Sequence, residues 1–262
     1  MIKKNNIKQK IKNGENVIGT FVKFTDASTI EIIGLLGFEF FVLDNEHVSM
    51  NRESMVNIIR AADATGIVPL VRVRENRPVE ILQALDSGAL GVQIPQVNTL
   101  EEAKSVVRSV KYAPMGDRGF APTHRAARYG IMDPVAYVEQ SNEETLVVCY
   151  CETGTAVDNL DEILTVEGID VIFVGPFDLS QSLGLTGQPK HPKVMEAIDK
   201  VIMKTTRAGK AVGIIASDAA EAKWWIDKGV QYITISSDQG MIVSRGKQIM
   251  SDLHINGAVA NK

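Results

Sequence analysis

The chain has 262 residues, 45% of them hydrophobic, and its formal net charge at pH 7 is −4. This length fits one large domain or two small ones and is sufficient to bury a sizeable core. The mixed charges give no broad basic field, so nucleic acid is not expected as a partner. The N-terminus lacks the apolar core of a signal peptide, and no stretch has the roughly 18 uncharged apolar residues of a membrane span. We therefore expect a cytoplasmic protein without membrane contact.

The N-terminus carries the basic stretch of the chain, formed by Lys3, Lys4, Lys8, Lys10 and Lys12. Three isoleucines lie between these lysines, at Ile2, Ile7 and Ile11. This pattern predicts an amphipathic helix over residues 1–15 that closes one end of a domain. A helix lying on a membrane surface is the alternative interpretation.

Eight short apolar runs, rich in Val, Ile and Phe, follow along the chain and mostly do not alternate with polar residues. Such runs are typical of strands that are covered on both faces in a parallel sheet. The predicted strands are Val17–Lys23, Phe38–Leu43, Val68–Val73, Gly91–Ile94, Leu146–Cys151, Val171–Val174, Ala211–Ile215 and Gln231–Ile235.

Amphipathic segments separate these strands, most clearly His191–Ala208, where apolar residues recur with helical periodicity. Thr99 with Glu102, and Asp218 with Glu221, have the spacing of capping boxes at helix starts. Glycines are expected to end the helices shortly before the next strand, at Gly37, Gly66, Gly88, Gly209 and Gly229.

Eight strand–helix units in about 250 residues match a (β/α)8 barrel. A doubly wound open sheet would usually have fewer strands and a G-x-G-x-x-G turn after the first strand, which this sequence lacks. The longest stretch between strands, 95–145, is expected to hold two helices around the loop 115–130. We therefore expect an α/β fold with a single TIM barrel over residues 1–262, an added N-terminal helix and a tail from about 255.

Polar residues stand where predicted strands end, and barrel enzymes carry their sites at these ends. Glu152 follows the fifth strand and Asp178 lies just beyond the sixth. Two carboxylates from adjacent strands can share Mg²⁺ or Mn²⁺, which keep several waters or substrate oxygens. The alternative is that each acid caps the helix that follows it.

Two further candidates follow the second strand and lie within the third. His47 ends a polar run with two acids, so it is a candidate base, although a hydrogen-bonded loop residue is the alternative. Arg72 lies in an apolar strand, where an unpaired guanidinium is costly to bury. It must therefore face a carboxylate, a phosphate or an anionic substrate, and a purely structural ion pair is also open.

The loop after the fourth strand is positively charged through Arg118, His124, Arg125 and Arg128. These side chains could recognise a distal carboxylate of a substrate or make subunit contacts. A solvated loop is the equally open alternative.

Several motifs together, from Gly19 to about Asp238, resemble the HpcH/HpaI aldolase family. They are Asp44-Asn45-Glu46-His47, Arg72 in P-L-V-R, Leu85-Asp86-Ser87-Gly88-Ala89, Glu152-Thr153, and G-P-F-D-L-S from Gly175 followed by Gly184 and His191-Pro192. The resemblance implies a class II, metal-dependent aldolase that cleaves 4-hydroxy-2-oxo acids to pyruvate and an aldehyde. It also implies a homo-oligomer, a hexamer built as a trimer of dimers, with active sites near subunit interfaces.

The resemblance implies a role for each matching residue. His47 would be the acid–base group, Asp86 would raise its basicity, Arg72 would stabilise the enolate, Glu152 and Asp178 would bind Mg²⁺, Mn²⁺ or Co²⁺, and the backbone at Phe177 and Asp178 would touch pyruvate. Asp44, three residues before His47, could also support the imidazole.

Tyr150 departs from the family pattern, because relatives often have a substrate-contacting glutamine there. The phenol could donate the same hydrogen bond, narrow the pocket or fill the barrel layer. Two other functions remain open: a Schiff-base aldolase that uses Lys23, and a non-catalytic barrel that only binds a 2-oxo acid.

Overall fold

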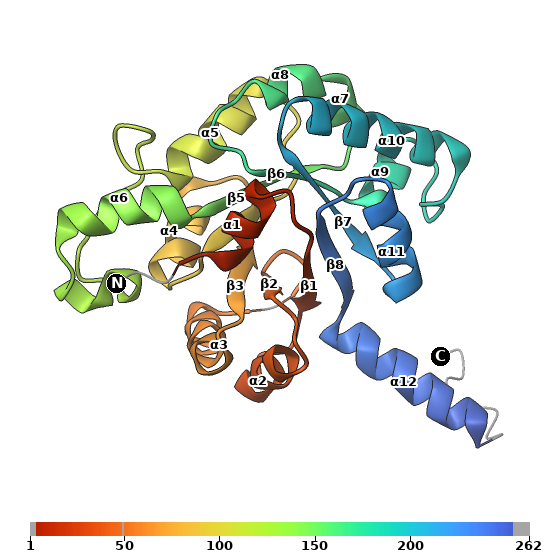
Figure 1. The fold of residues 1–262 in the computed structure, drawn as a ribbon, viewed down its shortest axis with the longest axis horizontal. Helices are drawn as coiled ribbons and strands as arrows, with labels where there is room; N and C mark the ends of the chain where they lie inside the picture. The colour runs from red at the N-terminus through yellow and green to blue at the C-terminus, as the bar shows by residue number, and fades with distance from the viewer. Residues whose placement is uncertain (1–3, 49, 254–262) are drawn as a thin grey trace.

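The computed structural model describes residues 4–48 and 50–253. Eight parallel strands pair in chain order and close into a barrel, with helices around it (Figure 1). The strands are β1 (Val17–Val22), β2 (Phe40–Asp44), β3 (Val68–Arg72), β4 (Gly91–Ile94), β5 (Leu146–Cys151), β6 (Val171–Val174), β7 (Ala211–Ala216) and β8 (Tyr232–Ser237). The predicted (β/α)8 barrel is confirmed, and each strand overlaps its predicted run.

The helices also follow the predicted order, with α5 and α6 between β4 and β5 and a short 3₁₀ segment, η1, in the loop between them. They are α1 (Asn6–Lys12), α2 (Ala27–Leu35), α3 (Arg52–Thr65), α4 (Pro78–Asp86), α5 (Leu100–Val110), η1 (Arg125–Gly130), α6 (Pro134–Glu144), α7 (Gly154–Asp158), α8 (Leu160–Leu164), α9 (Pro176–Ser182), α10 (Pro192–Arg207), α11 (Ala219–Asp227) and α12 (Asp238–Asp252). In the described part of the chain, no helix is long and apolar enough to cross a membrane. The tail expected from about 255 lies outside the described residues.

The predicted helix boundaries are largely present. Thr99 and Glu102 form a complete capping box at α5. At α11, Asp218 accepts from the backbone N–H of Glu221, but the Glu221 carboxylate accepts from Ser217 instead of completing the box. The five glycines expected to end helices all have positive φ, between 70° and 104°, a conformation that costs other residues energy.

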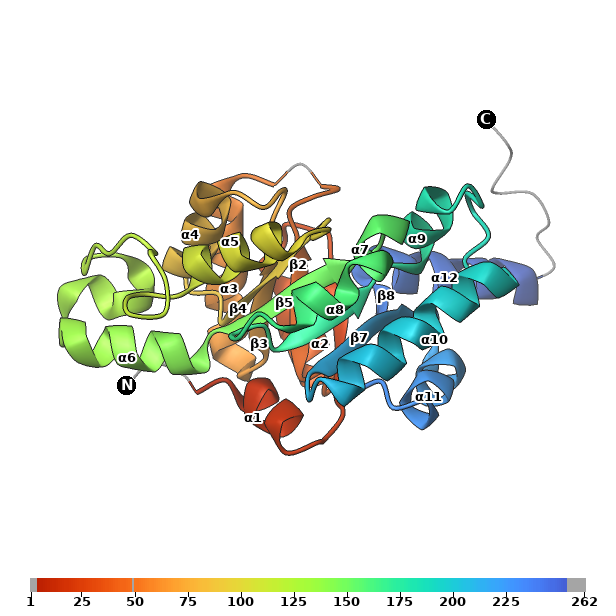
Figure 2. The ribbon, with the colours of Figure 1, turned by 90° about the horizontal axis from the view of Figure 1, so that it is seen from above.

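Helix α1 is shorter than the predicted 1–15 and lies across one end of the barrel (Figure 2). Ile7 is 1% exposed and belongs to the apolar cluster inside the barrel, so it is not free to enter a membrane surface. Lys8 is also buried, and its ammonium donates to the carbonyl of Thr145 at 2.7 Å and to Asp170 at 3.0 Å. The helix therefore closes this end of the barrel.

Large aromatic side chains fill the barrel interior. The Phe40 and Tyr232 rings stack with their centroids 4.4 Å apart. The Tyr150 hydroxyl donates to Gln93 Oε1 at 2.5 Å, and Gln93 Nε2 donates to the Tyr232 oxygen at 2.6 Å. This packing connects β4, β5 and β8 through one buried chain of hydrogen bonds.

Gly19 on β1 pairs with Phe40 on β2, and an added Cβ would lie 2.4 Å from the Phe40 ring. Because Phe40 is fully buried against Tyr232, it cannot move aside. We expect Gly19→Ala to lower the free energy of unfolding by about 1–3 kcal/mol, measured by urea denaturation. Gly246→Ala is the control, since no atom lies within 4 Å of its added Cβ. Equal effects of the two substitutions would contradict this account.

Candidate active site

The carboxyl ends of the strands surround a cavity of about 440 Å³. Five of the predicted site residues line it: His47, Arg72, Tyr150, Phe177 and Asp178. The remaining lining residues are Phe21, Lys23, Phe173, Gly175, Pro176, Ile215, Ser236 and Ser237. The location agrees with the expected end of the barrel.

Arg72 is held by two carboxylates from the end of β2. Its Nε and Nη2 lie 3.1 and 2.8 Å from the two oxygens of Asp44, and Nη1 lies 3.1 Å from Glu46. Asp44 is the direct strand partner of Arg72 and is fully buried. Burial alone would raise the pKa of Asp44, but the guanidinium keeps it below its ordinary value. The expected carboxylate partner of Arg72 is thus found within the chain.

Two aromatic rings flank the guanidinium, with the Phe21 and Tyr150 centroids 5.0 and 5.8 Å from its central carbon. Because the Tyr150 hydroxyl bonds to Gln93 inside the barrel, only the ring faces the cavity. Tyr150 therefore fills a layer of the barrel, and its hydroxyl is hydrogen-bonded to Gln93.

His47 stands at the edge of the cavity with its side chain 55% exposed. Its Nε2 lies 3.5 Å from Glu46 Oε2. Asp44 supports this loop through the backbone, since its Oδ1 accepts from the N–H groups of Glu46 and His47 at 3.1 and 3.3 Å. The acid nearest to the imidazole is therefore Glu46, for which no role was predicted from the sequence.

Asp86 ends α4, and the helices of a (β/α)8 barrel return to the amino ends of the strands. It lies at the opposite end of the barrel from His47, so the two do not meet within one chain. Its carboxylate pairs with Arg118 at 2.7 Å and lies 3.6 Å from His124 Nε2. Arg118 is buried there over the Tyr112 ring, which excludes the solvated-loop interpretation for this residue.

Glu152 and Asp178 approach each other across Gly175. A Cβ added at Gly175 would lie 2.8 Å from Glu152 Oε2 and 3.5 Å from Asp178 Oδ2, so both oxygens border the same small space. The N-caps of α7 and α9 are Thr153 and Gly175, which leaves the helix-capping alternative without support.

Glu152 is only 3% exposed, and its Oε1 accepts from the backbone N–H of Gln96 at 2.8 Å. Burial raises its pKa to about 7, and the negative charges of Asp178 and Glu46 act in the same direction. A cation beside this carboxylate would offset that cost. Across the described residues, no group of three or more His, Cys, Asp or Glu forms a metal cluster. Two carboxylates fit a divalent cation that completes its shell with water and substrate oxygens.

Other residues at this end of the barrel were not singled out from the sequence. Asp238, 5% exposed, accepts from the backbone N–H groups of Lys23 and Phe24 at 2.9 and 2.8 Å. The position of Asp238 directly after the eighth predicted strand could have identified it as a candidate site residue. The backbone N–H of Gln96 donates to Glu152, and Gln96 has a φ of 53°, a conformation that its sequence context does not predict.

Lys23 does not lie in apolar surroundings as a nucleophilic lysine should. Its Nζ is 3.6 Å from Asp44 Oδ2, and its side chain is 29% exposed. This ammonium is therefore a second positive neighbour of Asp44, beside Arg72.

The chain as a whole is similar to known aldolases. The family model described as HpcH/HpaI aldolase/citrate lyase matches residues 17–244. The 2-dehydro-3,6-dideoxy-6-sulfogluconate aldolase of Pseudomonas putida is 36% identical over 92% of this chain and 93% of its own. The 5-keto-4-deoxy-D-glucarate aldolase of Shigella boydii is 35% identical over 88% of this chain and 90% of its own. A crystal structure of an HpcH/HpaI aldolase/citrate lyase family protein from Burkholderia cenocepacia has 30% identity and a TM-score of 0.91, covering 95% of this chain and 99% of that one.

Removing the carboxylate of Asp44 should leave Arg72 buried without its bidentate partner. We expect Asp44→Ala to destabilise the protein by about 3–5 kcal/mol in urea denaturation, as for other broken buried pairs. Asp26→Ala is the matched control, since Asp26 is an exposed helix cap whose loss should cost about 1 kcal/mol. If Asp44→Ala lowers the free energy of unfolding no more than Asp26→Ala does, the buried pair of Asp44 and Arg72 does not stabilise the fold as proposed.

Proposed function

The chain belongs to the HpcH/HpaI aldolase/citrate lyase family, and we propose that it is a metal-dependent aldolase. It would cleave a 4-hydroxy-2-oxo acid reversibly to pyruvate and an aldehyde. One observation carries the proposal: Arg72, Asp178 and His47 line one cavity at the carboxyl ends of the strands, and Glu152 borders it at Gly175. The cavity thus offers an anion partner, an oxygen-rich cation site and a base.

His47 is the proposed base, because it lines the cavity and its Nε2 lies 3.5 Å from Glu46. It takes the proton of the C4 hydroxyl as the bond between C3 and C4 breaks. The aldehyde leaves, and the electron pair of that bond becomes the C2–C3 double bond of pyruvate enolate. Protonation at C3 then gives pyruvate.

Arg72 supplies the fixed positive charge for the negative charge that develops on pyruvate. Asp44 and Glu46 hold the guanidinium in place before the reaction, so it need not reorganise. Phe177 and Asp178, at the start of α9, are proposed to contact pyruvate through their backbone.

Glu152 and Asp178 would hold Mg²⁺, Mn²⁺ or Co²⁺. Such a cation, when bound, polarises the 2-oxo group as a Lewis acid, so the reaction needs no covalent lysine. The ion pair of Lys23 with Asp44 further disfavours the Schiff-base alternative. A barrel that only binds a 2-oxo acid would need no base, and the exposed His47 disfavours that alternative.

We expect EDTA to abolish pyruvate release from 4-hydroxy-2-oxo acids in an assay coupled to lactate dehydrogenase, and Mg²⁺, Mn²⁺ or Co²⁺ to restore it. Glu152→Gln should lower the rate about 100-fold or more, because it removes a proposed metal ligand. Glu139→Gln, on the exposed face of α6, is the control. Borohydride trapping with pyruvate would instead establish a Schiff base, and binding without turnover across metals would favour the non-catalytic barrel.

We also propose that the protein is a homo-oligomer, with the hexamer implied by family resemblance as the expected state. Helix α12 extends away from the barrel, whereas α2 and α11 lie against it (Figure 1). Ile242 and Val243 on α12 are 63% and 53% exposed, and Leu35 on α2 is 80% exposed. Exposed apolar side chains of this kind are typical of surfaces that another copy covers.

Ile242→Glu combined with Val243→Glu should therefore lower the molar mass in size-exclusion chromatography with light scattering. Gln248→Glu adds a charge at an exposed polar position of the same helix and should leave the mass unchanged. A mass that is the same for all three proteins would contradict a subunit contact through α12.

A further inference from the structure

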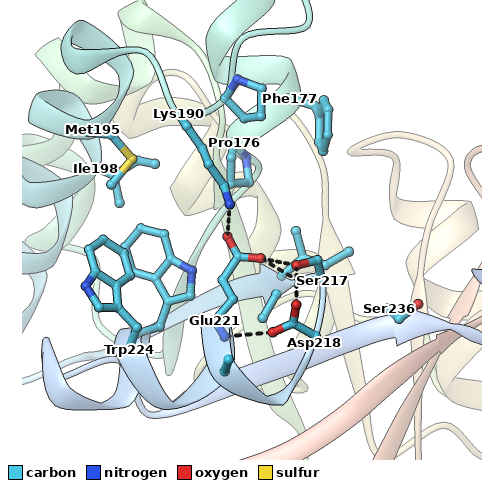
Figure 3. A pocket seen from close by; sticks show the side chains of 15 residues that line it. Pro176, Phe177, Lys190, Met195, Ile198, Ser217, Asp218, Glu221, Trp224 and Ser236 are labelled. Atoms are coloured by element: carbon cyan, nitrogen blue, oxygen red, sulfur yellow. Dashed lines mark hydrogen bonds and ion pairs between the residues drawn. The ribbon is translucent and has the colours of Figure 1, made fainter.

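A second cavity, of about 650 Å³, is lined by residues shown in Figure 3. Its volume is within the range of pockets that hold small molecules. Its wall is mostly apolar and includes Pro176, Met195, Ile198, Ile215, Ala220 and Trp224. These residues come from α9, α10, β7 and α11, so the cavity lies on the β6–β7 side of the barrel mouth.

The two cavities share part of their walls. Pro176, Phe177, Ile215 and Ser236 line both of them. Phe177 is 64% exposed, so this part of the shared wall is not a packed core. A tail on a molecule whose polar head lies near Arg72 would have to pass Ile215 and Phe177 to reach the second cavity.

Two acids and one lysine lie at the edge of the second cavity, and they are paired within the chain (Figure 3). Lys190 lies 3.5 Å from Glu221, which also accepts from the backbone N–H of Ser217 at 2.7 Å. Asp218 accepts from the backbone N–H of Glu221 at 2.9 Å, which lowers the pKa of Asp218. Two carboxylates thus face one ammonium, and an anionic tail would meet repulsion here.

We propose that the second cavity binds the tail of the aldehyde half of the substrate, and that this tail is neutral and apolar, such as an alkyl chain of several carbons. The inference rests on the proposed aldolase function and names its substrate class. The apolar wall favours a chain that leaves water, and the paired acids at the edge disfavour a carboxylate or sulfonate at its end.

The test is the addition of pyruvate to a set of aldehydes with Mg²⁺, Mn²⁺ or Co²⁺. In this direction pyruvate loses a methyl proton, its enolate carbon bonds to the aldehyde carbon, and the aldehyde oxygen gains a proton. Each buried methylene should raise kcat/KM about fourfold. We expect hexanal to exceed propanal by at least about tenfold, and butanal to exceed succinic semialdehyde, which has the same chain length with a terminal carboxylate.

Ala220→Trp should fill the cavity and lower the hexanal-to-propanal ratio at least about fivefold. Ala219→Trp is the matched control, because Ala219 is the neighbouring exposed alanine of α11 and does not line the cavity. The hexanal-to-propanal ratio of kcat/KM in Ala219→Trp should equal that of the unmodified protein. Circular dichroism and light scattering on both variants establish that the fold and the subunit count are retained.

Exchange of the pyruvate methyl protons in D₂O, followed by NMR, needs the pyruvate half of the site and no aldehyde. If the methyl protons exchange but hexanal is not preferred over propanal, the proposal that the second cavity binds the aldehyde tail is wrong and the proposed aldolase function stands. The same conclusion follows if the hexanal-to-propanal ratio of kcat/KM is unchanged in Ala220→Trp. No exchange with any of the three metals overturns both. A change in subunit count in Ala220→Trp at an unchanged ratio would identify the cavity as a contact between copies.

Discussion

The buried ion pair between Asp44 and Arg72 organises the mouth of the barrel. One carboxylate at the end of β2 binds the guanidinium from β3, approaches the ammonium of Lys23 after β1, and accepts from the backbone of the His47 loop. A guanidinium among apolar strands is tolerated only with such partners. The same pairing that permits its burial also fixes the direction in which Arg72 presents charge to a ligand.

The other side of the cavity depends on the lack of a side chain at Gly175. The space that a Cβ would occupy is bordered by the carboxylates of Glu152 and Asp178. Burial raises the pKa of Glu152, so this side of the cavity favours added positive charge, whereas the other side presents the guanidinium of Arg72. A 2-oxo acid together with a cation would satisfy both sides at once.

The barrel could be predicted from the sequence because strands buried on both faces have a distinctive apolar pattern, and because capping residues and glycines mark the helices between them. The burial of Arg72 also followed from its apolar neighbours. The pairing of Tyr150 with Gln93 and Tyr232 could not be predicted, since it depends on side chains of three strands meeting inside the barrel. Asp86 was associated with His47 by resemblance alone, which does not say that α4 ends at the far side of the barrel.

Helix α1 closes the end of the barrel opposite the cavity, so ligands can exchange only through the cavity end. With Ile7 of α1 at one end and the Phe40–Tyr232 stack within, the described side chains fill the centre of the barrel. Everything that binds at the mouth must enter and leave on the same side. For the proposed cleavage, the fragment that is released last would compete with the incoming substrate for the empty site, whereas the fragment released first would not.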